Sequence, residues 1–147
     1  MHAAHTLVLL VADHDIRLLR NEGLGKGLSD IRHLTRADLP DVAFEFDDQP
    51  VRTTGHGMTA HAETPRQTKH EKERERMAKH AIAQLRSEWG QGGYSRLIVS
   101  APDKMLHLLR KGMPKDIAPH LTADLDKDLV KVARADLPAH FEGVAAF

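Results

Sequence analysis

The sequence predicts an α/β fold in which helices cover a mixed sheet of about five strands. Three short segments rich in β-forming residues come first, and helical and strand patterns then alternate to the end of the chain. Adjacent strands joined by tight turns pair antiparallel, whereas strands separated by a helix run parallel. Because the chain has both kinds of connection, the expected sheet is mixed. The 147 residues favour a single domain, residues 1–147.

The first part of the chain predicts three consecutive strands. Thr6–Ala12 is continuously apolar, which is typical of a strand buried on both faces in the middle of a sheet. Asp13–Asp15 forms a turn into a second strand, Ile16–Arg20, so that these two strands make a hairpin. Glu22–Gly27 holds three glycines and predicts another turn. A weaker third strand is expected over Ile31–Ala37.

A long irregular segment, residues 38–67, follows these strands. Its hydrophobic residues follow neither the strand period nor the helix period, and Pro40, Pro50, Gly55 and Pro65 interrupt it. Long segments without secondary structure in a compact domain are usually functional or disordered. We therefore expect an exposed loop that takes part in binding.

The clearest predicted element is a helix over Thr68–Trp89. Thr68 and Glu71 have the spacing of a capping box, which predicts the start of the helix. A glycine-rich stretch directly after Trp89 predicts its end. Its apolar residues recur at three- and four-residue steps and form one stripe that requires burial. The stripe consists of Met77, Ala78, Ala81, Ile82, Leu85 and Trp89.

The rest of the chain alternates between strands and helices. Tyr94–Ser100 contains a short buried strand, and Asp103–Lys111 predicts a second helix that a glycine ends. Leu121–Leu125 predicts a fifth strand, and Leu137–Gly143 a short last helix. The resulting order, β-β-β-α-β-α-β-α, is that of the ribonuclease-H-like fold. Topology alone does not specify an activity.

The composition excludes several classes of site. Lys plus Arg and Asp plus Glu both number 21, so the formal net charge is zero, and only a local basic patch would serve to bind nucleic acid. The absence of cysteine excludes disulfides, thiolate zinc sites and cysteine nucleophiles. The apolar N-terminal run is too short to span a membrane and lacks the flanks of a signal peptide. We therefore expect a cytoplasmic protein with no membrane partner.

Several segments carry a family resemblance, and they span nearly the whole chain. They are Leu7–Asp13 with Ile16–Leu18, Lys69–Ala78, Leu97–Pro102 with Leu108–Lys111, and Asp126–Leu129. Together they resemble the bacterial host-attachment protein family, which is similar to the middle domain of the archaeal and eukaryotic peptide-chain release factors. The resemblance implies a ribonuclease-H-like fold and a link to the ribosome.

The chain departs from these families at two places. His14 follows the acid that ends the first strand, where many family members have glycine. The Gly-Gly-Gln tripeptide with which release factors hydrolyse peptidyl-tRNA is absent from the irregular segment, which has Gly55-His56-Gly57 instead. Gln91-Gly92-Gly93 contains the same residue types in another order, and we expect it to end the first helix, not to form a catalytic loop.

A hydrolase or metal-dependent nuclease on the same fold is the competing hypothesis. Such a nuclease needs several carboxylates that converge on hard cations. Asp13 ends the first strand, and the first helix offers acids for the same site: Glu71, Glu73 and Glu75. The fourth strand ends in Ser100, however, so the set is incomplete. We therefore expect Asp13 to be a turn residue.

Two other metal patterns also fail. Three acids open like a calcium-binding loop, namely Asp124, Asp126 and Asp128. Leu129 and Ala135 stand where such a loop needs glycine and glutamate. A zinc site from His56, His61 and His70, together with Glu63, would match no known ligand spacing. The sequence therefore predicts no metal ion and no cofactor.

The predicted binding surface combines the irregular segment with the start of the first helix, because a helix N-terminus favours anions. Its residues are Arg52, His56, His61, Arg66, Lys69 and His70, together with Asp13 and Arg17 from the first hairpin. The leading hypothesis is a non-enzymatic binding module that associates with the ribosome or RNA. A third hypothesis is an indirect regulator of bacterial attachment to host cells. The sequence specifies no oligomeric state.

Overall fold

A computed structural model describes residues 5–42 and 65–147, with only the backbone described for residues 65–67. Three strands come first, and helices and strands then alternate, in the predicted order. The elements are β1 (Thr6–Val11), β2 (Asp15–Asn21), β3 (Ser29–Thr35), α1 (Pro65–Gly92), β4 (Arg96–Ser100), α2 (Asp103–Gly112), β5 (Leu121–Leu125) and α3 (Leu137–His140). Short 3₁₀ helices cover Arg36–Asp38, Ala118–His120 and Arg134–Asp136.

The five strands form one mixed sheet in the order β3-β2-β1-β4-β5. β2 pairs antiparallel with β1 and with β3, whereas β4 pairs parallel with β1 and with β5. The predicted mixed five-stranded sheet is therefore confirmed, and so is the central place of the first apolar strand. The parallel strands end at one edge of the sheet, which we call the carboxyl edge.

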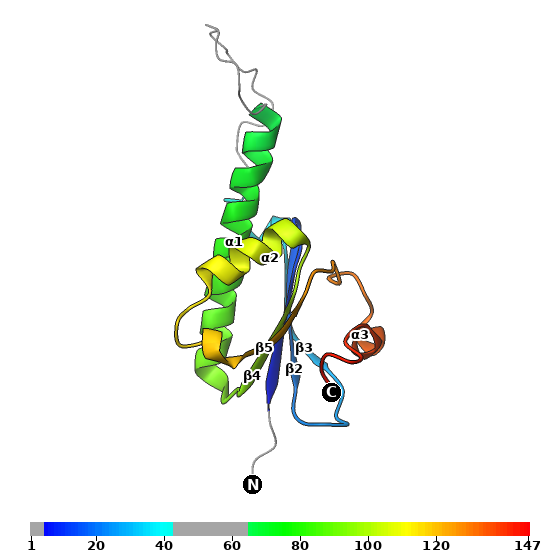
Figure 1. Ribbon diagram of the computed structural model, residues 1–147. Coiled ribbons are helices and arrows are strands. Elements are labelled where there is room, and N and C mark those ends of the chain that lie inside the picture. The colour runs from blue at the N-terminus through cyan, green and yellow to red at the C-terminus, as the bar shows by residue number, and fades with distance from the viewer. Residues whose placement is uncertain (1–4, 43–64) are drawn as a thin grey trace, which may run out of the picture.

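The sheet separates α1 and α2 on one side from α3 on the other (Figure 1). A hydrophobic cluster lies on each side of it. Side chains alternate along a strand, so Leu7 and Leu9 of β1 face α1 and α2, whereas Val8 and Leu10 face the C-terminal segment with Phe141. All of these side chains are fully buried. Each buried aliphatic side chain stabilises the fold by roughly 1.5–3 kcal/mol. This two-sided burial explains why the first strand is continuously apolar.

The apolar stripe of α1 is buried as predicted. Met77, Ala81 and Leu85 are fully buried, while Ile82 and Trp89 are partly buried against the same cluster. The predicted capping box is wrong, because the helix already begins at Pro65 and Thr68 lies inside it. Proline suits a first helical turn, where its missing N–H would have no partner in the helix.

Glycines end α1 as the sequence predicts. The helix runs through Gln91 and stops at Gly92, and Gly93 has a φ of +67°. A β-carbon at Gly92 would lie 2.3 Å from the ring of Tyr94, so the close approach of that ring requires glycine. The Gln-Gly-Gly tripeptide is therefore a helix end.

Two other boundaries differ from the predictions. β3 ends at Thr35, not Ala37, because the carboxylate of Asp38 accepts a hydrogen bond from the Thr35 N–H (2.9 Å) and starts a 3₁₀ turn. α3 is a single turn that ends at His140. Most of the predicted irregular segment lies outside the described residues, and its last three residues belong to α1. No helix within the described residues is long and apolar enough to cross a membrane.

Candidate functional site

The carboxyl edge of the sheet holds a cluster of charged side chains from three segments. Arg36, just after β3, donates from Nε to the carbonyl oxygen of Asp13 (3.3 Å) and from Nη2 to Oε1 of Glu73 on α1 (3.4 Å). The carboxylate of Asp13 lies 3.6 Å from Nε of Arg74. We call these four residues the carboxyl-edge cluster. It joins the turn after β1, the end of β3 and the first half of α1.

Each acid of this cluster has an arginine beside it. Glu73 is only 4% exposed, so its charge requires a partner, and Arg36 supplies it. Nδ1 of His70 lies 3.8 Å from the same carboxylate. The two acids that the nuclease hypothesis places here, Asp13 and Glu73, therefore face guanidinium groups. Within residues 5–42 and 65–147, no three His, Asp or Glu side chains form a group that could hold a metal ion.

Two of the three acids that resemble a calcium-binding loop form hydrogen bonds within the fold. Arg110 of α2 binds Asp124 of β5 with two hydrogen bonds of 2.8 Å, from Nε and Nη2. This guanidinium holds the pKa of the Asp124 carboxyl below its usual range. Asp128 accepts a hydrogen bond from the Val130 N–H (3.4 Å). Asp124 and Asp128 thus each have a partner within the chain.

The structure describes only part of the predicted binding surface. Arg52, His56 and His61 lie outside the described residues, and the side chain of Arg66 is not described. Lys69 and His70 lie on the first turns of α1, beside the carboxyl-edge cluster. Asp13, from the same prediction, belongs to that cluster.

Arg17 is directed into the protein. It is 8% exposed, and its Nη1 donates to the carbonyl oxygens of Val130 (3.2 Å) and Val132 (2.6 Å). Its Nη2 lies 3.4 Å from the Asp30 carboxylate. This guanidinium therefore holds the C-terminal segment against β2, and it is not an exposed cation of the binding surface.

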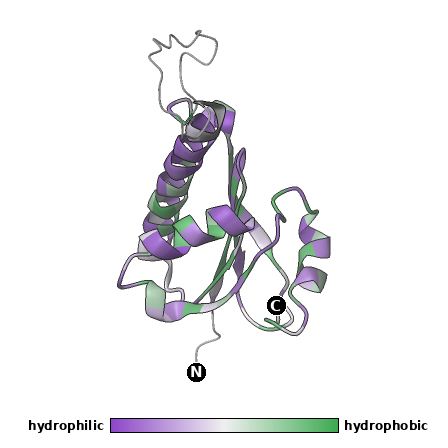
Figure 2. Cartoon of the chain, turned by 45° about the horizontal axis from the view of Figure 1, so that its top comes forward, coloured by the Kyte–Doolittle hydropathy of each residue, from purple (hydrophilic) through white to green (hydrophobic). Residues whose placement is uncertain are grey.

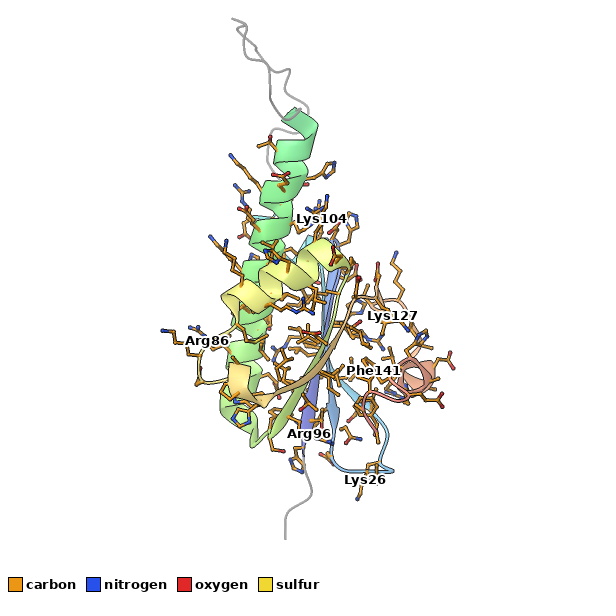
Figure 3. The ribbon with its side chains drawn as sticks, viewed as in Figure 1. Lys26, Arg86, Arg96, Lys104, Lys127 and Phe141 are labelled. Carbon is orange, nitrogen blue, oxygen red and sulfur yellow. The ribbon has the colours of Figure 1, made fainter. Side chains whose placement is uncertain are left out.

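The outer face of α1 carries a row of basic side chains that the sequence analysis did not single out. We call it the basic stripe, and it consists of Lys69, Lys72, Arg76, Lys79 and Arg86. These positions succeed one another at three-, four- and seven-residue steps, so they share one helix face over about 25 Å. Lys72, Lys79 and Arg86 are exposed, and Lys69 and Arg76 are partly exposed. Figure 2 shows that the first turns of α1 are hydrophilic. Figure 3 shows Arg86 on the side of α1 that faces away from the sheet.

Burial of two acids helps to keep this face basic. α1 has four acids, at positions 71, 73, 75 and 88, and Glu73 and Glu88 are buried. Glu88 accepts a hydrogen bond from the Tyr94 hydroxyl (2.7 Å), and Arg20 and Arg32 lie 3.9 and 3.8 Å from its carboxylate. The two inward acids thus pair with partly exposed arginines of the sheet side and not with the outer cations of α1. The stripe could have been predicted from the sequence, because its basic residues recur at steps of three, four and seven residues.

The family model described as "Bacterial archaeo-eukaryotic release factor family 12" matches residues 5–140. The chain belongs to this family. The membership confirms the release-factor part of the resemblance seen in the sequence. The family's description makes no mention of attachment to host cells.

Solved structures also resemble this family 12 chain at low identity. One, described as "Archaeal protein", aligns with a TM-score of 0.49 and 13% identity over 96% of this chain and 34% of its own. The crystal structure of the archaeal translation termination factor aRF1 aligns with a TM-score of 0.45 and 11% identity, over 95% of this chain and 38% of its own. The chain thus spans little more than a third of these proteins. No curated protein matches it.

Proposed function

We propose that this member of release factor family 12 is a non-enzymatic module that associates with the ribosome by binding RNA. The basic stripe on α1 is the observation that carries the proposal. A neutral protein binds RNA only by concentrating positive charge locally, and five cations share this helix face. Membership of a release-factor family supports ribosomal RNA as the RNA that the stripe binds.

The position of α1 makes the stripe accessible to a large partner. Figure 1 shows the first turns of the helix extending past the edge of the sheet. Lysine and arginine side chains on such a helix contact phosphates and position the partner without reading its bases. The expected binding is therefore electrostatic, tolerant of sequence and weakened by salt.

Co-sedimentation with ribosomes at low and high salt tests the proposal. The stripe variant is Lys69→Glu, Lys72→Glu and Arg76→Glu, and the control is Lys26→Glu, Lys115→Glu and Lys131→Glu. Both variants change the net charge equally, but the control residues lie off α1 and are exposed. We expect the stripe variant to lose most low-salt retention and the control to keep it. Circular dichroism checks that both fold.

Binding to a labelled single-stranded RNA gives a second readout. The logarithm of the association constant falls as the logarithm of the salt concentration rises, and each lost phosphate contact makes this slope less steep by about 0.7. The stripe variant should therefore show a shallower salt dependence than the control. Equal retention of the two variants, or no retention of the wild-type protein at any salt, would exclude RNA binding by the stripe.

The predicted surface next to the start of α1 is tested separately. Charge reversal of Arg52, Arg66 and Lys69 together should also reduce ribosome or RNA retention, because these cations are predicted to adjoin the same helix end. A loss in this variant alone, with the stripe variant unaffected, would move the contact from the stripe to the predicted loop.

An effect on attachment to host cells would, in this proposal, be indirect and follow from altered protein synthesis. Cells that carry the stripe variant should then attach less only where ribosome association is also reduced. Reduced attachment with unchanged ribosome association would favour a role separate from RNA binding.

A further inference from the structure

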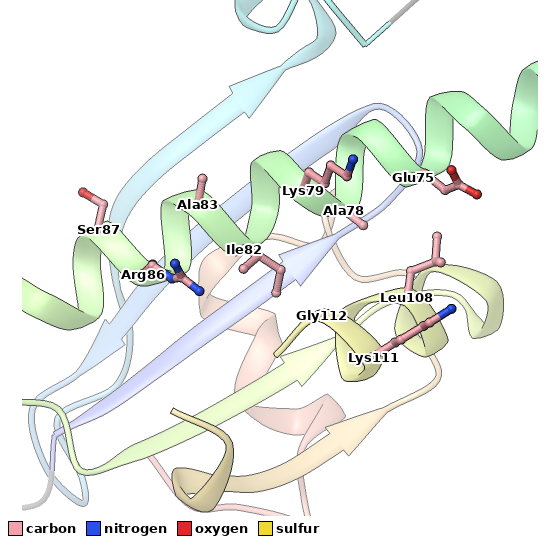
Figure 4. Close-up of a pocket in the computed structure, with 10 residues that line it drawn as sticks. All are labelled: Glu75, Ala78, Lys79, Ile82, Ala83, Arg86, Ser87, Leu108, Lys111 and Gly112. Atoms are coloured by element: carbon pink, nitrogen blue, oxygen red, sulfur yellow. The ribbon is translucent and has the colours of Figure 1, made fainter. Parts of the chain in front are cut away.

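A groove of about 820 Å³ runs between α1 and α2 on the outer side of the fold (Figure 4). Aliphatic side chains form its floor, and charged side chains form its rim. The floor consists of Ala78, Ile82 and Leu108, and the rim includes Glu75, Lys79, Ala83, Arg86 and Lys111. Pockets of this size hold ligands as large as a drug molecule, so the groove can take two or three apolar side chains of a partner.

A glycine at the end of α2 leaves space in one wall of the groove. Gly112, the last residue of α2, faces Ile82, and a β-carbon there would lie 3.8 Å from Cγ1 of Ile82. Any larger side chain at this position would extend over the floor. Ile82 and Leu108 remain partly exposed although both are aliphatic, and Ala83 is exposed. The described residues therefore leave part of this apolar surface uncovered.

The rim is predominantly positive. Lys79 and Arg86 extend from α1 and Lys111 extends from α2. Glu75, at one end, is the only acid among the described residues that line the groove. Within the part of the chain that the structure describes, none of these three cations forms an ion pair. An apolar floor between cationic walls is complementary to an apolar strip flanked by acids.

The chemistry of the floor distinguishes between protein and RNA as the occupant. Proteins that bind single-stranded RNA stack its bases on aromatic side chains, and none of the described residues that line this groove is aromatic. Aliphatic grooves between helices bind the apolar face of an amphipathic helix. We propose that the α1–α2 groove binds an acidic amphipathic helix of a partner protein, with its apolar residues on Ile82 and Leu108 and its acids beside Lys79, Arg86 and Lys111. The groove shares Lys79 and Arg86 with the basic stripe, whereas its apolar floor and Lys111 lie outside the stripe.

Fluorescence anisotropy with three labelled peptides of about 15 residues tests this groove. The first has leucine at three- and four-residue steps and glutamate on its other face. The second has the same residues scrambled, and the third has lysine in place of glutamate. We expect the first peptide to bind at least about tenfold more tightly than the others. Equal affinity for all three would overturn the proposal.

Two variants test whether the peptide binds in the groove. Ala83→Glu with Lys111→Glu puts negative charge on the rim at two exposed positions, and its matched control is Ala135→Glu with Lys131→Glu. Gly112→Leu covers the floor without changing any charge. We expect both groove variants to weaken the acidic peptide at least about tenfold and the control to leave it unchanged. The same affinity in the groove variants and the control would overturn the proposal.

Two further measurements distinguish other occupants. The stripe variant at Lys69, Lys72 and Arg76 should bind the peptide normally. Gly112→Leu, which changes no charge and lies on α2, should keep RNA retention, so that either proposal can fail alone. An RNA oligonucleotide that displaces the peptide and loses affinity in Gly112→Leu would show an RNA site instead. A wild-type dimer in analytical ultracentrifugation that Ala83→Glu with Lys111→Glu separates would show a contact between two copies of this chain. Either result would overturn the proposal.

Discussion

The hydroxyl of Tyr94, which precedes β4, donates a hydrogen bond to the buried carboxylate of Glu88 near the end of α1, with 2.7 Å between the oxygens. Tyr94 also stacks on Trp89, with ring centroids 5.8 Å apart, and accepts a hydrogen bond from Nε of Arg20 (3.2 Å). The contact therefore fixes the end of α1 against the sheet. It also turns one acid of the helix inward, which is part of the reason why the outer face is basic.

The titration of Tyr94 provides a test of this contact. Burial, and then the hydrogen bond to Glu88, raise the pKa of Tyr94 from 10.0 to about 12. The chain has one tyrosine, so its absorbance reports this group alone. Because the folded pKa is the higher one, the associated stability is present below pH 10 and is lost as pH rises through about 12.

The variant Glu88→Gln should lower the pKa of Tyr94 but leave it above its ordinary value, because burial, the larger cause, remains. The comparison requires that circular dichroism shows the folded state throughout the titration. A phenol that titrates at its ordinary pKa in the folded wild-type protein would contradict the buried contact.

Arg17 should contribute to stability and not to binding. The variant Arg17→Met removes the donors to Val130 and Val132 and leaves buried carbonyl oxygens without them. The expected loss is about 1–3 kcal/mol, which lowers Tm by several degrees in a domain of this size. Lys131→Met, an exposed change in the same segment, is the control. Unchanged stability together with reduced RNA retention would return Arg17 to the binding surface.

The sequence predicts best those features that depend on a repeated local pattern. The continuous apolar run from Thr6 identifies a strand buried on both faces, and the spacing of Met77, Ala81 and Leu85 identifies the buried face of α1. Each pattern reflects many side chains that meet the same environment. The order of the elements followed from these patterns and led to the correct mixed sheet.

Features that depend on one distant partner could not be predicted. Arg17 resembles any polar residue in a strand, and its partner Val130 lies 113 residues further along the chain. In the sequence Glu88 resembles an exposed helix residue, and only the fold brings Tyr94 and two arginines to its carboxylate. Arg36 likewise gains its role only when the fold brings Asp13 and Glu73 together.

The ion pair between Arg110 and Asp124 should make stability depend on pH in the acid range. Arg110 lowers the pKa of Asp124, so this contribution is present above the ordinary carboxyl pKa of 3.8 and is lost as pH falls through the lower folded value. Asp124→Asn should therefore lower Tm slightly at neutral pH and approach the wild-type Tm in strong acid. Asp116→Asn, an exposed change, is the control. The same deficit at all pH values would show that charge is not the cause.

Magnesium or manganese should leave the thermal stability of the isolated protein almost unchanged. Only a ligand that binds the folded state shifts the folding equilibrium, by about 2.7 kcal/mol at a hundredfold excess over its Kd. Asp13 and Glu73, the acids that a nuclease on this fold would use, each lie beside an arginine, and an added dication would have to displace Arg74 or Arg36 from them. Differential scanning fluorimetry with either metal, against potassium chloride of equal ionic strength, measures the effect. A large, saturable rise in Tm that Asp13→Asn abolishes would show that these acids do bind a metal, and it would revive the nuclease hypothesis.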